Sequence, residues 1–162
     1  MKLTTADLSD THPLAQVAES LFHDFGCVKM FDGPVVTVKV FEDNAIVRTL
    51  LEEPGDGRVL VIDGGGSMRC ALVGGNLAQL GVANGWRGLV VNGCIRDSAE
   101  IREMPIGVKA LGTHPRKSEK GLHTGHRNRP VLFAGVTFRN NQWLYADSDG
   151  MVISEVSLHE RA

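Results

Sequence analysis

Two short apolar runs mark the middle of the chain. Residues 59–62 and 88–93 lack the alternation of polar and apolar positions that a half-exposed strand shows. Such runs are typical of strands that are covered on both faces. Between them, residues 76–84 place apolar side chains at near-helical spacing, and Asn84-Gly85 is a helix stop signal. The pattern predicts a strand, a glycine-rich loop, a helix and a second strand.

The rest of the chain carries weaker patterns of the same two kinds. Capping residues and helical spacing predict helices at 4–10, 13–25, 44–53 and 98–104. Strands are predicted at 35–41 and 106–111, with three more within 131–154. Because helices gather early and strands late, we predict a single α+β domain over 1–162, of the swivelling β/β/α sandwich type with N-terminal helices.

The start of the central helix decides what the glycine-rich loop can bind. A helix starting at Ser67 would hold Gly74 and Gly75 in its interior, at a cost of about 1 kcal/mol each relative to alanine. A start at Gly74-Gly75 removes this cost and leaves the first amides, those of Gly75, Asn76 and Leu77, without acceptors. Free amides at a helix N-terminus favour an anion. We therefore expect an anion-binding helix terminus here.

Arg96 and Asp97 follow the second strand, at the end where layered α/β folds bind ligands. Asp97 is a candidate ligand for Mg²⁺ or Mn²⁺, since magnesium sites use only one or two carboxylates and retain waters. Arg96 offers a planar fork of donors to a carboxylate. With the helix amides, these groups suit a small α-keto acid. The alternative is an Arg-Asp pair that only caps a turn or forms a surface ion pair.

Residues 112–130 predict a loop of unusual length, which is typical of functional segments and subunit contacts. The loop is rich in basic residues, among them Lys117. It either forms the rim of the site and attracts anionic substrates, or it is a solvated basic loop. Lys117 is the residue of this loop that we would test first.

The triple glycine after Asp63 does not match a dinucleotide-binding loop. It lacks the G-x-G-x-x-G spacing and a following acidic residue, and no Walker lysine is present. Asp63 itself either caps the glycine turn or faces the metal, and we favour the turn.

Composition narrows the class of protein. The 43% apolar content excludes a disordered chain, and the net charge of -2 argues against a nucleic-acid-binding surface. Three cysteines without a C-x-x-C pair predict reduced thiols in a cytoplasmic protein, and Cys94 is interpreted as a packing residue. No apolar run approaches the roughly 18 residues of a membrane span.

Several motifs, read together, resemble one known family. They are Asp63-Gly-Gly-Gly-Ser67, Leu72-Val-Gly-Gly-Asn-Leu-Ala78, Asn92-Gly-Cys-Ile-Arg-Asp97, the HPRKS run at 114–118 and Tyr145-Ala-Asp147. The chain resembles the regulator of ribonuclease activity A family, which is similar to the metal-dependent 4-hydroxy-4-methyl-2-oxoglutarate/4-carboxy-4-hydroxy-2-oxoadipate aldolases. The resemblance implies a β/β/α fold, a ring-shaped homotrimer and a site near a subunit boundary.

The family's catalytic signature is an aspartate, twenty residues and then Arg-Asp. Here Arg96 and Asp97 match, while the leading position is Gly75. The resemblance implies a lyase that releases pyruvate from 4-hydroxy-4-methyl-2-oxoglutarate and also decarboxylates oxaloacetate. Arg96 and Asp97 would be catalytic, Asp97 would hold the metal, and Gly74 to Leu77 with Arg96 would bind the substrate. Two alternatives stay open: a protein that binds and regulates ribonuclease E, and a non-catalytic ring that binds a small carboxylate.

Overall fold

A computed structural model describes residues 3–121 and 124–159 of the chain. Within these residues, one ten-stranded sheet lies beside a two-stranded hairpin. The helices are α1 (Thr5–Thr11), α2 (Ala45–Glu52), α3 (Gly75–Ala83) and α4 (Ser98–Ile101). The strands are β1 (Gln16–Val17), β2 (His23–Asp24), β3 (Phe31–Val40), β4 (Val59–Asp63), β5 (Ala71–Val73), β6 (Gly88–Ile95), β7 (Gly107–Thr113), β8 (Gly125–Arg127), β9 (Val131–Phe133), β10 (Val136–Phe138), β11 (Trp143–Asp147) and β12 (Gly150–Ser154).

The centre of the sheet is formed by β3, β4, β6 and β7, which run parallel to one another. Their apolar runs are buried on both faces, as the lack of alternation predicted. Leu60 and Ile62 of β4 pack in one apolar cluster, while Val59 and Val61 pack in the other. Burial of such a side chain contributes about 1.5–3 kcal/mol, so both faces stabilise the position of these strands.

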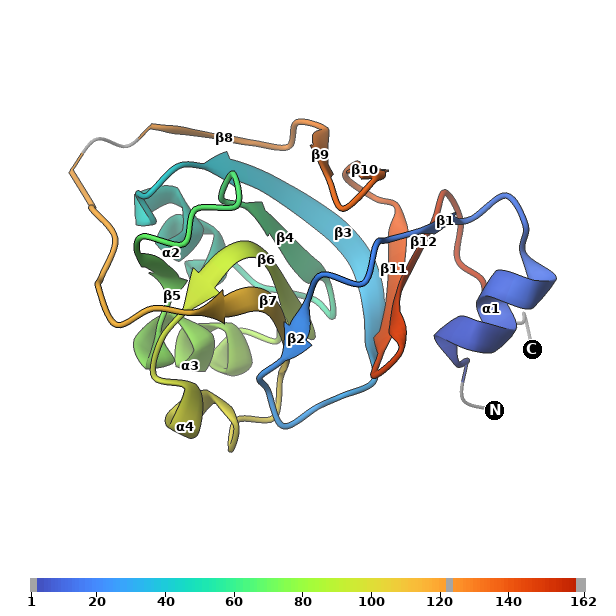
Figure 1. Cartoon of the computed structure of the whole chain (residues 1–162), viewed down its shortest axis with the longest axis horizontal. Coiled ribbons are helices and arrows are strands. Elements are labelled where there is room, and N and C mark those ends of the chain that lie inside the picture. The colour runs from blue at the N-terminus through green and yellow to red at the C-terminus, as the bar shows by residue number, and fades with distance from the viewer. Residues whose placement is uncertain (1–2, 122–123, 160–162) are drawn as a thin grey trace.

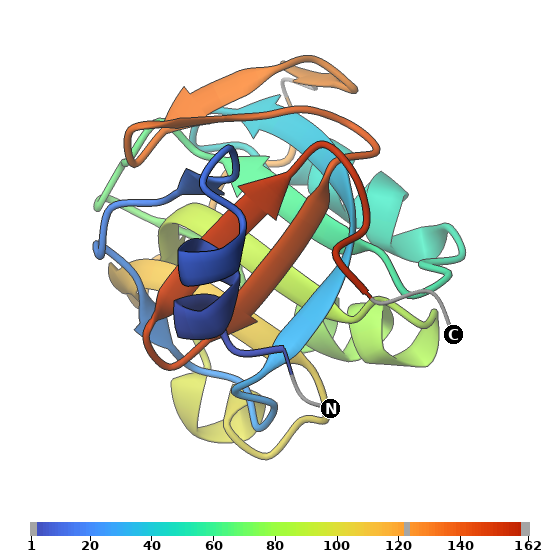
Figure 2. The ribbon, with the colours of Figure 1, turned by 90° about the vertical axis from the view of Figure 1, so that its right-hand side faces the viewer.

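Each face of the central strands is covered by a different kind of element. Helices α2 and α3 cover one face, and the strands β9 to β12 pack on the other (Figure 1). Helix α1 lies outside β11 and β12 (Figure 2). The fold is therefore mixed α/β, with one large sheet and few helices, and the predicted fold class is confirmed. The longest helix in the described part of the chain, α3, has nine residues, and none could cross a bilayer.

The predicted helix at 13–25 is wrong. This segment forms only β1 and β2, which pair with β12 and β7 at two different places on the sheet. Leu14, one of the residues that suggested an amphipathic helix, is 98% exposed. An isolated short helix is marginal in water, whereas strand edges offer ready backbone partners, so the segment crosses the sheet in extended form. We expected more than one N-terminal helix, and the described residues before β3 form only α1.

Smaller differences concern boundaries and turns. The helix predicted at 98–104 ends at Ile101, and the long loop at 112–130 contains β8. The region 131–154 holds four strands, since β9 and β10 form a hairpin. Ala134 and Gly135, which lie between them, both have positive φ, as a tight hairpin turn requires. Because alanine rarely adopts a positive φ, Ala134 does not indicate a turn at this place in the sequence.

Candidate active site

Helix α3 begins at Gly75 with Gly74 as its N-cap, as the glycine pair predicted. Strand β5 leads into it and pairs with β6, so the helix tip lies beside the carboxyl end of β6. A β-carbon on Gly74 would lie 2.9 Å from Asp97 Oδ2 and 3.3 Å from Arg96 Cγ and Nε. Glycine at this position therefore permits a close approach of helix and strand end.

Asp97 contacts the helix tip directly. Its Oδ2 accepts a hydrogen bond from the Gly75 backbone amide at 2.8 Å. Asp97 adopts φ 57°, a conformation that is uncommon for a residue other than glycine. The expected meeting of acid and helix terminus is thus present. One detail of the expectation is wrong, because the Gly75 amide is already occupied. Among the described residues, the amides of Asn76 and Leu77 have no acceptor and remain available.

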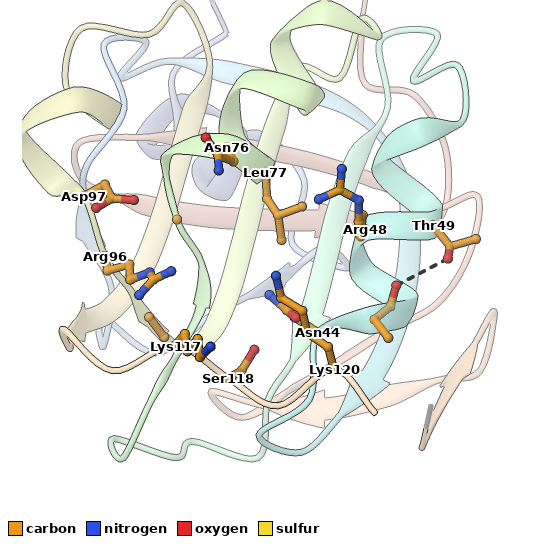
Figure 3. Close-up of a pocket in the computed structure, with 13 residues that line it drawn as sticks. Asn44, Arg48, Thr49, Asn76, Leu77, Arg96, Asp97, Lys117, Ser118 and Lys120 are labelled. Carbon is orange, nitrogen blue, oxygen red and sulfur yellow. Dashed lines mark hydrogen bonds between the residues drawn. The ribbon is translucent and has the colours of Figure 1, made fainter. Parts of the chain in front are cut away.

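These groups open onto a cavity of about 330 Å³. Its volume falls in the range of small-molecule sites. Figure 3 shows Arg96 and Arg48 on opposite sides of the cavity, with both guanidinium groups directed toward it. The cavity is lined by Asn44, Ala45, Arg48, Thr49, Ala71, Gly74, Asn76, Leu77, Arg96, Asp97, Lys117, Ser118 and Lys120.

The lining of the cavity carries more positive than negative charge. Arg48, Arg96, Lys117 and Lys120 bring four cations, and Asp97 alone among the described lining residues brings a negative charge. Low-dielectric walls strengthen the field inside such a cavity. The lining therefore favours an anion of more than one charge.

The loop that carries the two lysines is attached to the sheet at this point. Ala71 of β5 donates a backbone hydrogen bond to the Arg116 carbonyl at 2.8 Å, and Glu119 donates one to the Glu42 carbonyl at 2.9 Å. These contacts place Lys117 at the rim of the cavity, where the sequence suggested it. Ser118 is only 4% exposed, and its hydroxyl has no hydrogen-bond partner in the described part of the chain. A buried hydroxyl without a partner is costly, so this oxygen is suited to meet a ligand.

The donor set fits a hard divalent cation. Asp97 keeps one carboxylate oxygen free of the contact with Gly75, and its side chain is exposed. The described residues contain no cluster of three His, Cys, Asp or Glu side chains that could enclose a metal. A single carboxylate with waters and substrate oxygens is the usual environment of Mg²⁺, whereas structural zinc needs a closed set of ligands.

Two residues near the site are structural. The Asp63 Oδ1 accepts hydrogen bonds at 2.9 Å from the Gly65 amide and from Asn92 Nδ2, so the turn role is confirmed. Cys94 is fully buried, and burial raises the pKa of its thiol. A raised pKa keeps the thiol protonated and unreactive, in agreement with a packing role.

Sequence reasoning missed two residues of this region. Arg48 lines the cavity because α2 packs beside α3. The two helices begin at Ala45 and Gly75, so their contact is not visible in local spacing. Glu100 of α4 is exposed, and its carboxylate also lies over Gly75, which the helical spacing of residues 98–104 does not indicate.

Comparison with known proteins defines the class. The family model described as "RraA-like: Aldolase/RraA" matches residues 5–153. The chain belongs to this family, as the motifs indicated.

Individual relatives carry different names. A protein of Alkalilimnicola ehrlichii named "Putative 4-hydroxy-4-methyl-2-oxoglutarate aldolase" is 56% identical over 160 residues, which are 98% of each chain. The structure titled "RNA-processing inhibitor RraA from Thermus thermophilis" is 45% identical, with a TM-score of 0.95 over 98% of this chain and 96% of that one. A structure from Geobacillus kaustophilus, titled as a 2-dimethylmenaquinone methyltransferase, is 48% identical, with a TM-score of 0.94 over 96% and 97%. Because these names differ, the activity has to be argued from the site.

Proposed function

We propose that this protein is a divalent-metal-dependent lyase that releases pyruvate from 4-hydroxy-4-methyl-2-oxoglutarate and also decarboxylates oxaloacetate. The observation that carries the proposal is the contact of Asp97 with the tip of α3 at the edge of a cation-lined cavity. Both substrates are α-keto dicarboxylates, and the cavity offers separate donors for two carboxylates. The names of close relatives support the aldolase part of this proposal.

The two ends of the cavity would bind the two carboxylates of the substrate. Arg96 and the amides of Asn76 and Leu77 would hold the carboxylate beside the keto group. Arg48 and Lys120 would receive the distal carboxylate. This arrangement would put the reacting bond between the two groups of donors and beside Asp97.

Asp97 would hold Mg²⁺ or Mn²⁺ through its free oxygen. When bound, the cation supplies Lewis-acid polarisation of the substrate's keto oxygen. The Asp97 side chain is exposed and could otherwise rotate. The hydrogen bond from the Gly75 amide fixes the orientation of its carboxylate, and so the position of a bound cation.

Cleavage of the aldol substrate breaks its C3–C4 bond. The C4 hydroxyl loses its proton, C4 becomes the carbonyl carbon of one pyruvate, and the bonding electron pair moves to C3 of the other half. The enolate formed there takes up a proton, so one substrate yields two pyruvates. Oxaloacetate gives the same enolate by loss of carbon dioxide, and this step needs no base to begin it.

The test is pyruvate release from both substrates by wild type, Asp97→Ala and the exposed control Asp10→Ala. We expect Asp97→Ala to lose about 10³-fold in kcat on both substrates, as for the removal of a principal electrostatic group. Wild type and Asp10→Ala should lose activity when a chelator is added. Equal, metal-independent activity of all three variants would refute the proposal, as would aldol cleavage without any decarboxylation.

We also propose that the protein assembles as a homotrimer in the cytoplasm. The resemblance of the sequence motivates this, and exposed apolar side chains such as Phe41, Met68 and Leu132 supply surface that assembly would cover. Light scattering should give three times the 17.5 kDa mass of the chain. A monomer at micromolar concentration would contradict it.

A second candidate function rests on the structure titled as an RNA-processing inhibitor, which superimposes with a TM-score of 0.95. By this proposal the protein would bind ribonuclease E and lower its rate of RNA cleavage. Purified ribonuclease E, assayed with and without a tenfold excess of this protein, tests the idea. An unchanged cleavage rate would exclude it.

A further inference from the structure

The carboxylate of Glu100 occupies the space beside Gly75 at the tip of α3. A β-carbon built on Gly75 would lie 2.4 Å from Glu100 Oε2 and 3.4 Å from Asp97 Oδ2. No side chain at residue 75 could therefore share this space with the present position of Glu100. The carboxylate of Glu100 stands where the first side-chain atoms of residue 75 would be.

The position of Glu100 follows from the turn after Asp97. The Asp97 carbonyl accepts the backbone amide of Glu100 at 3.0 Å, which closes the first turn of α4. Residues three apart in such a turn lie on one side, so both carboxylates face the tip of α3. Glu100 is not among the described residues that line the cavity, so a substrate would touch both acids by extending over Gly75.

No partner occupies the Glu100 carboxylate in the described part of the chain. It forms no hydrogen bond and no ion pair with any described residue. The nearby Asp97 carboxylate is different, because one of its oxygens is held by Gly75. Of these two acids, Glu100 is thus the one whose carboxylate oxygens are both without a hydrogen-bond partner among the described residues.

We propose that Glu100 is the proton-transferring residue of the aldol cleavage, acting from α4 in the space that Gly75 leaves open. The inference rests on the proposed lyase function. Glu100 would accept the proton of the C4 hydroxyl as the C3–C4 bond breaks, and would then return it to C3 of the enolate. The glutamate regains its starting state, and no other reactant is needed. Such transfers contribute about 10²–10⁴-fold to a rate.

A purely structural role for Glu100 makes different predictions. A carboxylate near the N-terminus of α3 would interact favourably with the helix dipole, by about 0.3–1 kcal/mol. Its removal would then lower the melting temperature but would leave the ratio of the two activities unchanged. Proton transfer predicts the reverse, since oxaloacetate needs no base to start its decarboxylation.

The experiment compares wild type, Glu100→Gln and the matched control Glu103→Gln, which changes an exposed acid just beyond α4. We expect Glu100→Gln to lower kcat for aldol cleavage by about 100-fold and for decarboxylation by less than about 3-fold. Calorimetric titration with Mn²⁺, and with oxalate in its presence, should give unchanged affinities, because Glu100 is not assigned to hold either. Glu103→Gln should behave as wild type.

A double variant tests whether any carboxylate in the space beside Gly75 can transfer the proton. Gly75→Asp combined with Glu100→Ala, which clears the space beside residue 75, should raise the aldol rate at least about tenfold over Glu100→Ala alone, because an acid then occupies the same place from α3. Unchanged aldol turnover in Glu100→Gln would overturn the inference. So would parallel loss of both activities together with Mn²⁺ binding. If wild type cleaves neither substrate, the proposed function fails instead.

Discussion

The two ends of the cavity are built in different ways. At one end, Asp97 lies at the close of a buried strand and is fixed to Gly75 by a hydrogen bond of 2.8 Å. At the other end, Arg48 comes from the exposed face of α2, and Lys120 comes from a loop. The first end depends on close contact between backbone elements. The second presents exposed side chains whose contribution is charge, with Arg48 paired to Glu52 of the same helix at 3.1 Å.

This difference indicates a division of labour. Chemistry at the C3–C4 bond requires atoms held to within a fraction of an ångström, and only the acidic end has such a support. Recognition of a distal carboxylate tolerates motion, because charge attraction falls slowly with distance. We therefore expect changes at the acidic end to lower kcat, and changes at the basic end to raise KM.

The largest effect is expected from a substitution that displaces the groups at the acidic end without removing any functional group. Gly74→Ala would place a methyl group 2.9 Å from Asp97 Oδ2 and 3.3 Å from Arg96. Misplacement of reacting groups by about 1 Å costs on the order of 10²-fold in rate, so we expect such a loss in kcat with little change in melting temperature.

Gly121→Ala is the matched control, since a methyl group there would meet nothing within 4 Å. Steady-state kinetics on oxaloacetate measures both variants. Equal activity of Gly74→Ala and Gly121→Ala would contradict the requirement for close approach.

A smaller effect is expected from Arg48→Ala at the basic end. Loss of one charge-assisted contact to the distal carboxylate should raise KM about tenfold, or 1.4 kcal/mol, with kcat nearly unchanged. Inhibition by pyruvate, which has no distal carboxylate, should be unaffected. Arg102→Ala, an exposed arginine outside the lining, is the control. If Arg48→Ala weakens inhibition by pyruvate as much as it weakens substrate binding, Arg48 binds the carboxylate beside the keto group and not the distal one.

The smallest effect concerns the attachment of the basic loop. Arg127 of β8 binds both carboxylate oxygens of Glu53 at 2.7 and 2.9 Å, just after α2. The hydrogen bonds from Arg127 lower the pKa of Glu53 despite its partial burial. A lowered pKa means that this stabilisation is fully present above the ordinary glutamate pKa and is lost as the pH falls from there through the lowered pKa of the folded state.

Both side chains are more than one third exposed, so the contribution to the free energy of unfolding is at most about 1 kcal/mol. Urea unfolding of Glu53→Gln should show this loss at neutral pH and no difference from wild type in acid. If Glu53→Gln is still less stable than wild type at low pH, the loss of stability comes from packing and not from the ion pair.

The parts of the molecule that could be predicted from sequence share a local cause. The start of α3 followed from the cost of glycines inside a helix, and the meeting of its tip with Asp97 followed from the geometry of parallel strands. The roles of Arg48 and Glu100 depend on how α2 and α4 pack against α3, which no local pattern records. The segment 13–25 failed for the same reason, since its strands are formed by distant partners, β12 and β7.

The most direct test of the account is the rate of pyruvate release from 4-hydroxy-4-methyl-2-oxoglutarate by the wild-type protein, with saturating Mg²⁺ and again after chelation. The account predicts a measurable rate that disappears with the cation and returns when Mn²⁺ is added. A rate that is indifferent to chelation, or no release under any of these conditions, would contradict it.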